Sequence, residues 1–199
     1  RGKPVEDVEA FAGNSFGLSA ICYTGDWPEN DTENKWTTNF AHNVKVSTTD
    51  KGATWKPAIP LHWLGSGNLR FFAYSPYSAI GTGSSTDNAE SDKTSDVAAE
   101  YSITHSRETE TGIPTLTYTV PDDVTKQVDL MVATADCKGD GTGTDANAGT
   151  VSLKFTHALT SVTIKTGEKM LAGKVTGISI SGVYGSGTYR IGADKWTTT

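Results

Sequence analysis

The sequence predicts an all-β protein, an antiparallel β-sandwich of about seven to ten strands with at most one short helix. Three observations lead to this prediction. Apolar and polar residues alternate with a period of two in several short segments, which is the pattern of strands that bury one face. Glycine contributes 21 of the 199 residues and threonine recurs throughout, a composition typical of turns and pleated strands. Clusters of Gly, Pro and Asp separate the segments at short intervals.

The strongest alternation lies in the segment Val151–Lys165, which reads VSLKFTHALTSVTIK. Its apolar positions are Val151, Leu153, Phe155, Val162 and Ile164. The interruption that starts at His157 suggests a bend or a change of partner sheet. We therefore expect a long strand here, bent at His157, around which the other strands pair.

Three further strands are predicted in the first 80 residues, at Phe16–Tyr23, Phe40–Thr48 and Leu69–Tyr74. The last of them is apolar on both faces except for Arg70, which is typical of a central strand covered on both sides. Residues 1–15 carry a proline, two glycines and scattered charge, and are interpreted as a leader or edge segment.

In the rest of the chain, strands are predicted at Leu116–Val120, Gln127–Ala135, Val175–Val183 and Gly187–Ile191. The first of these ends at a Pro-Asp-Asp turn sequence. The one predicted helix covers Asp96–Tyr101, where Ser95 or Asp96 can cap it.

Charge and hydropathy exclude some classes of protein. The formal net charge is −6, and no cluster of Lys or Arg forms a phosphate-binding face, which argues against nucleic-acid binding. No run approaches the roughly 20 apolar residues of a membrane-spanning helix. The sequence starts at Arg1 without a signal peptide, so we expect a processed or trimmed N-terminus.

Motifs of catalysis and metal binding are not found. The sequence has no nucleophile elbow, phosphate-binding loop or HExxH motif, and its four histidines are far apart. The segment 136–149 starts like a calcium loop, but Lys138 occupies a ligand position and no Glu closes it. Asp122 and Asp123 lie in a turn, where solvated carboxylates are common. We assign no catalytic residue, no metal ligand and no cofactor.

Four tryptophans in the first third of the chain allow two interpretations: Trp27, Trp36, Trp55 and Trp63. Indole rings on the loops of a sandwich can stack on sugar rings, which would make these residues a carbohydrate-binding platform. Alternatively, the Trp-Pro and Pro-rich segments around them simply cover a sheet.

The two cysteines, Cys22 and Cys137, also allow two interpretations. They can pair as a disulfide if the compartment is oxidising. They can instead be small buried apolar side chains. Their spacing is not that of metal ligands.

Several segments together resemble the fimbrillin family, which comprises pilus subunits and tip adhesins of Bacteroidales-type Gram-negative bacteria. In order, these segments are WKPAIPLHW, LRFFAYSP, LTYTVPDDVTKQVDLMVATA, VSLKFTHALTSVTIK and ISGVYGSGTY, with the closing Trp196. They span about residues 53–196. The resemblance implies a sandwich of the transthyretin-like type. It also implies that residues 1–199 are a single N-terminal domain whose C-terminal domain is not in the sequence.

The resemblance further implies an exported, lipid-anchored protein at the outer membrane, without enzymatic activity. Family members form cell-surface fimbriae, related to type V pili, after a protease cuts behind an arginine and a neighbouring subunit's strand fills the groove. Arg1 stands in the region of such a processing site. The expected partners are other fimbrial subunits and, for an adhesin, host or bacterial surface ligands. The alternative function is a surface carbohydrate-binding module that uses the four tryptophans.

Overall fold

The computed structural model describes residues 5–27, 36–78, 81–82, 103–107, 113–147, 149–162, 164–165, 167, 173, 175–193 and 195–198. Its elements, in chain order, are α1 (Val8–Ala12), β1 (Phe16–Tyr23), β2 (Trp36–Ser47), β3 (Lys56–Pro57), β4 (Asn68–Ser75), β5 (Gly81–Thr82), β6 (Ile103–Arg107), β7 (Pro114–Thr119), β8 (Met131–Lys138), β9 (Ala146–Asn147), β10 (Thr150–Val151), β11 (Thr156–His157), β12 (Ser186–Arg190) and β13 (Lys195–Thr197).

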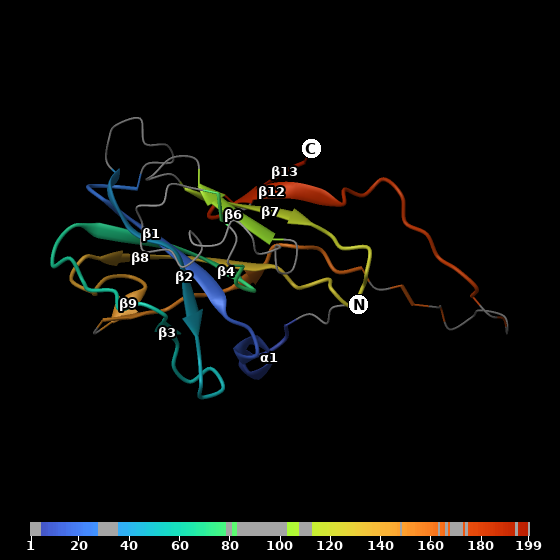
Figure 1. The fold of residues 1–199 in the computed structure, drawn as a ribbon, viewed down its shortest axis with the longest axis horizontal. Helices are drawn as coiled ribbons and strands as arrows, with labels where there is room; N and C mark the ends of the chain where they lie inside the picture. Colours follow the sequence, from blue (N-terminus) through green and yellow to red (C-terminus); the bar gives the residue numbers. More distant parts are fainter. Residues whose placement is uncertain are drawn as a thin grey trace.

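The strands form two main sheets that face each other (Figure 1). The first sheet has the strand order β11-β8-β4-β1-β2-β3, and the second has the order β13-β12-β7-β6-β5. Strands β9 and β10 form a small separate pair. All described pairs are antiparallel except β5 with β6, which are parallel over two residues. The prediction of an all-β sandwich is confirmed.

One hydrophobic core lies between the two sheets. Alternate residues of the first sheet, such as Ile21, Phe72 and Val132, meet Leu116 and Tyr189 of the second sheet. These side chains are almost fully buried, at 0 to 4% exposure. The period of two along each strand selects which residues enter this core.

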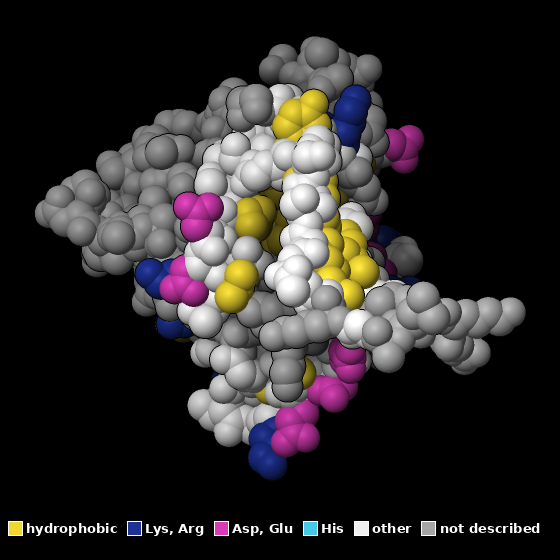
Figure 2. Space-filling model, turned by 90° about the vertical axis from the view of Figure 1, so that its right-hand side faces the viewer, with side chains coloured by type: hydrophobic (Ala, Val, Ile, Leu, Met, Phe, Trp, Pro, Cys, Tyr) yellow, Lys and Arg dark blue, Asp and Glu magenta, His cyan; other side chains and the backbone are white. Residues whose placement is uncertain are grey.

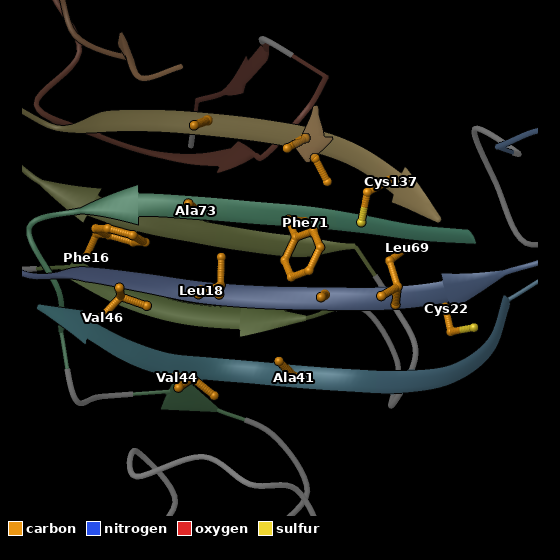
Figure 3. Packing of buried hydrophobic residues seen from close by; sticks show 14 residues of the cluster. Phe16, Leu18, Cys22, Ala41, Val44, Val46, Leu69, Phe71, Ala73 and Cys137 are labelled. Carbon is orange, nitrogen blue, oxygen red and sulfur yellow. The ribbon is translucent and has the colours of Figure 1, made fainter. Parts of the chain in front are cut away.

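A second core covers the outer face of the six-stranded sheet (Figure 3). It is formed by the other alternate residues of the same strands, including Phe16, Leu18 and Phe71, so the sheet is buried on both faces. Its cover consists of half-buried side chains from α1 and from two extended segments, residues 54–64 and 151–155: Phe11, Trp55, Ile59, Leu61, Trp63, Val151, Leu153 and Phe155. This confirms the prediction that the central strand Leu69–Tyr74 is covered on both sides.

A buried polar network fixes the chain after β4 against β2. The Tyr74 hydroxyl donates to Asn43 Oδ1 at 2.8 Å, and the Asn43 amide donates to the Ser78 carbonyl oxygen at 3.0 Å. Asn43 is fully buried and has a φ of 46°, a left-handed conformation that Asn tolerates better than most residues. Ser19 Oγ accepts a hydrogen bond from the Asn43 backbone N–H at 2.9 Å, which satisfies this donor.

Several predicted strands agree with the structure. The bounds of β1 are those predicted, and β2, β4, β7 and β12 differ from prediction by a few residues at their ends. Strand β8 ends three residues later than expected, at Lys138. Eight described strands are three residues or longer, which lies within the predicted range.

The N-terminal segment, predicted as a leader or edge segment, contains a short helix. Helix α1 begins after Asp7, whose side chain accepts a hydrogen bond from the Ala10 backbone N–H at 2.7 Å. Phe11 reaches from this helix into the outer core, with its ring centroid 4.7 Å from that of Phe155. The helix predicted at Asp96–Tyr101 lies outside the described residues.

The prediction of one long strand over Val151–Lys165 is wrong. Residues 151–155 do turn Val151, Leu153 and Phe155 toward the outer core, but only the two-residue strands β10 and β11 pair in a sheet. The strand predicted at Val175–Val183 is also not formed: these residues are exposed and lie outside both sheets. In both places the sequence pattern reports an amphipathic extended chain and does not report whether a partner strand lies beside it.

Candidate functional site

The candidate site is the segment between the two sheets, residues 160–185, which we call the arm. It follows β11 of the first sheet, precedes β12 of the second, and extends well beyond both (Figure 1). No described residue of the arm belongs to a strand or a helix. The described parts of the arm therefore contribute no strand to either of the sheets that they connect.

Large hydrophobic side chains of the arm are exposed to solvent: Val162 56%, Ile164 55%, Val175 50%, Ile178 60%, Ile180 54%, Val183 69% and Tyr184 71%. They are spaced by two residues at Val162 and Ile164 and again at Ile178 and Ile180, as on one face of a strand. In Figure 2, which looks onto the end from which the arm projects, hydrophobic side chains lie on both sides of a narrow strip of backbone and polar atoms.

The exposure of these side chains is energetically unfavourable. Complete burial of a Val or Ile side chain stabilises a protein by roughly 1.5–3 kcal/mol relative to exposure. Hydrophobic residues scattered singly on a surface are ordinary, whereas a contiguous exposed set indicates an interaction surface. The arm is therefore a candidate interaction surface, whose exposed hydrophobic side chains have in part the two-residue spacing of a strand face.

Both ends of the arm are fixed to the sandwich. Before the arm, the Ala158 N–H donates to the Leu130 carbonyl oxygen at 2.8 Å, and the Ala158 carbonyl oxygen accepts from the Trp196 indole N–H at 2.8 Å. At the last residue of the arm, the Gly185 carbonyl oxygen accepts from the Val120 N–H at 2.8 Å. Hydrogen bonds thus hold the chain to the sandwich near both ends of the arm.

The four tryptophans do not form one platform. Trp27 packs against the core between the sheets, with the Arg70 guanidinium 4.6 Å from the centre of its ring. Trp55 and Trp63 cover the outer core on the opposite face of the six-stranded sheet. Trp36 begins β2, and its side chain lies outside the described part of the chain. A role of these residues in stacking on glycans stays a prediction.

The Arg70 guanidinium that lies over Trp27 also forms a two-fold ion pair. Its Nε and a terminal nitrogen donate to the two Asp136 carboxylate oxygens at 2.7 and 2.6 Å. Arg70 is the one charge in the otherwise apolar predicted strand, and the structure places it in β4 directly opposite Asp136 of β8. These contacts give Arg70 and Asp136 a structural role in the sheet.

The Gly- and Asp-rich loop after β8 holds itself together with its own carboxylates. Asp140 Oδ1 accepts from the Thr142 N–H at 3.0 Å and from the Thr142 hydroxyl at 2.7 Å, which lowers the pKa of Asp140. Asp145 accepts from the Asp136 N–H at 2.8 Å. Within the described residues, no group of His, Cys, Asp and Glu has a geometry that could hold a metal ion.

Cys22 and Cys137 do not form a disulfide with each other. Cys22 of β1 is opposite Leu69 of β4, and Cys137 of β8 is opposite the same Leu69 on its other side. Two spacings between strands amount to roughly 9–10 Å, whereas bridged cysteines have Cα atoms within about 7 Å. Both side chains are buried, in agreement with the second of the two interpretations.

His157, at the expected bend, lies beside a carboxylate. Its Nδ1 is 2.9 Å from Asp129 Oδ2, which also accepts from the Val5 N–H at 2.8 Å. This contact links β11 to the segment before α1 and supports a structural role for His157. Arg1, the predicted processing residue, lies outside the described residues. None of the helices that the structure describes has the length and hydrophobicity needed to cross a bilayer.

Comparisons with known proteins connect this fold to fimbriae. Among solved structures, a fimbrial protein from Bacteroides vulgatus ATCC 8482 matches with a TM-score of 0.52 and 20% sequence identity. The match covers 92% of this chain and 53% of that protein, so the chain spans about half of its length. A likeness at this identity supports the fold alone. The comparison with curated proteins gives no match.

The family comparison is more extensive. The model of the fimbrillin-like family matches residues 12–199, which is nearly the whole sequence and includes the arm. This confirms the resemblance carried by the five sequence segments. The chain belongs to the fimbrillin-like family.

Proposed function

We propose that this chain is a structural, non-enzymatic subunit of a cell-surface fimbria and that it joins neighbouring subunits by β-strand addition. The observation that carries the proposal is the arm, whose large hydrophobic side chains are exposed with the spacing of a strand. A strand gains backbone hydrogen bonds when it is added to a sheet edge, and it gains burial of alternate side chains at the same time. The described residues of the arm are outside both sheets, and their large hydrophobic side chains are exposed, so both the backbone and the side chains can gain contacts in such an addition.

The finer parts of the proposal follow from the family. We propose that the protein is exported, attached to the outer membrane through a lipid, and part of a polymer with like or unlike fimbrial subunits. A transthyretin-like type of sandwich and a role in adhesion belong to the same proposal. The carbohydrate-binding alternative receives less support, because the described tryptophans are divided between two faces of a sheet.

The test is made on the surface of the cells that produce the chain. Filaments sheared from the surface are probed with an antibody against this chain, and their masses are measured after detergent treatment. We expect a ladder of species above 21.1 kDa. A single species on the surface, with no filament that carries the chain, would contradict the proposal.

Variants then test the role of the arm. Replacing Ile178 and Ile180 by Ser is expected to abolish the ladder without unfolding the sandwich, because both side chains are exposed. The matched control is Leu64→Ser, which removes a 46% exposed apolar side chain near the opposite end of β8. Filaments that form normally from the double variant would exclude the arm as the assembly surface.

A further inference from the structure

We propose that the outer face of the second sheet binds an acidic polysaccharide, a glycan that carries carboxylate or sulfate groups. This face is formed by the outward-directed residues of β7, β12 and β13, and we call it the hydroxyl face. The inference deepens the adhesive part of the proposed function and rests on it, since a subunit on a cell surface meets such glycans. It does not involve the arm.

The register of the three strands places their outward-directed residues in rows. Leu116, Tyr118 and Tyr189 are buried and define the inner face, so the residues next to them in sequence belong to the outer face. Directly opposite residues of an antiparallel pair share a face. The rows are Thr119 with Ser186, then Thr117 with Thr188 and Thr197, and then Thr115 with Arg190 and Lys195. The hydroxyl face thus consists of Ser and Thr side chains and two cations.

The hydroxyl face is accessible to a ligand. Thr117, Thr119, Lys195 and Thr197 are exposed, and the other members are half-buried. None of the large hydrophobic side chains that are exposed in the described part of the chain belongs to β7, β12 or β13. Because a protein–protein interface has an apolar centre, a face of this kind favours a hydrophilic ligand over a protein partner.

The chemistry of the face matches that of a sugar. The hydroxyls of Thr117 and Thr188 are 3.2 Å apart, so hydroxyl groups of neighbouring strands are already within hydrogen-bonding distance of each other. A Ser or Thr hydroxyl both donates and accepts hydrogen bonds, and the hydroxyls of a sugar ring do the same. Rows about 6.8 Å apart on strands about 4.8 Å apart present several such groups to neighbouring sugar rings.

Two cations meet in one row and indicate that the glycan is acidic. Arg190 of β12 is directly opposite Lys195 of β13, an arrangement that is unfavourable for like charges. None of the described strands of the second sheet contains Asp or Glu. A carboxylate or sulfate between the two side chains would relieve their repulsion and accept charge-assisted hydrogen bonds from both.

A nucleic acid fits this face less well than a glycan. The aromatic residues of the three strands, Tyr118, Tyr189 and Trp196, lie on the inner face, where they pack in the core between the sheets. Bases therefore find no aromatic ring to stack on at the hydroxyl face. The net charge of −6 also opposes a polyanion of high charge density, whereas a glycan with widely spaced acidic groups needs few cations.

The experiment measures binding of the purified 199-residue chain to three dextrans of equal length, which are neutral, carboxymethylated and sulfated. Isothermal titration calorimetry gives the affinities. We expect saturable binding of at least one acidic dextran and roughly tenfold weaker or no binding of neutral dextran. Polyglutamate carries carboxylates without sugar hydroxyls, and we expect it to bind roughly tenfold more weakly than the acidic dextran that binds.

Variants assign the binding to the hydroxyl face. Lys195→Gln removes an exposed cation and is expected to weaken binding of the acidic dextran roughly tenfold. Lys56→Gln removes an exposed lysine from β3 of the other sheet and is the matched control, expected to bind as the parent chain does. Thr117→Val removes one exposed hydroxyl and is expected to weaken binding of the acidic dextran alone, leaving polyglutamate unaffected. Unchanged melting temperatures show that the variants are folded.

Four results would overturn the inference. They are the absence of binding to both acidic dextrans, equal binding of neutral dextran, equal binding of polyglutamate, and a Lys195→Gln variant that binds as the parent chain does. All four are measured on the isolated chain, so they leave the proposal of strand addition standing. The loss of the ladder from the cell surface would contradict that proposal without changing the binding result.

Discussion

The indole N–H of Trp196 donates a hydrogen bond to the carbonyl oxygen of Ala158 at 2.8 Å, which ties strand β13 of the second sheet to the chain just before the arm. Ala158 also donates to Leu130 beside β8. The two sheets are therefore bridged at the base of the arm.

Replacement of Trp196 by Phe tests this link. Phe keeps ring packing on Tyr189, whose centroid is 5.1 Å from that of Trp196, but loses the hydrogen bond. We expect the free energy of unfolding to fall by about 1 kcal/mol, as for a partly buried hydrogen bond. Denaturant titration measures the change. Thr117→Val, which removes an exposed contact to Thr188, is the control and is expected to change little.

The Tyr74 hydroxyl offers a second test. It bonds to Asn43 Oδ1 and to the Ser78 backbone inside the protein. Tyr74→Phe leaves these groups buried and without this partner, so we expect a loss of about 1–3 kcal/mol in the free energy of unfolding. Tyr184→Phe makes the same chemical change at a 71% exposed position and is expected to have no effect. Equal stabilities of the two variants would show that the network does not stabilise the fold.

The Gly-rich loop after β8 is expected to tolerate no side chain at Gly141. A Cβ there would lie 2.8 Å from Cε2 of Trp63, and φ is +79°. Gly65 has a similar φ of +76° but open space around it, so Gly65→Ala isolates the backbone cost of roughly 1–2 kcal/mol. We expect Gly141→Ala to lose clearly more stability in thermal melts than Gly65→Ala. Equal losses would mean that the Trp63 contact is unimportant.

Alkaline pH is expected to destabilise the protein through Cys137. Burial, together with the Asp136 charge, raises the pKa of this thiol from 9.0 to about 11. Between these values the unfolded chain loses the proton and the folded chain keeps it, so the free energy of unfolding falls as pH rises from about 9 to 11. Denaturant titrations at several pH values should show a shallower fall for Cys137→Ala. Identical slopes would contradict this assignment.

The sequence predicts those strands whose own pattern of apolar and polar residues shows which faces are buried. Strand β4 is apolar enough on both faces to identify a central, doubly covered position, and the alternation in β1 is enough to predict its bounds. The outer cover was harder to predict, because residues 54–64 contain prolines and stay extended with few sheet hydrogen bonds. Helix α1 is only five residues long and has no buried residue, so it leaves almost no periodic pattern.

Other features depend on parts of the chain that only folding brings together. The buried Asn43 becomes explicable once strand register places it beside Tyr74 and Ser78. For the arm, the sequence pattern is clear but the partner that it needs is not visible in the sequence. Its alternation predicts strands, because a period of two describes a face that needs a partner and does not say whether the partner belongs to the same chain.

The most direct test of the account is hydrogen exchange at the backbone amides of residues 175–185, measured in the monomeric chain and in assembled filaments. In the monomer these residues lie outside both sheets, so their amides should exchange rapidly. If the arm adds to a sheet of another copy, assembly should slow their exchange by roughly tenfold or more. Amides of the arm that exchange as fast in the filament as in the monomer would contradict the claim that the arm joins the subunits.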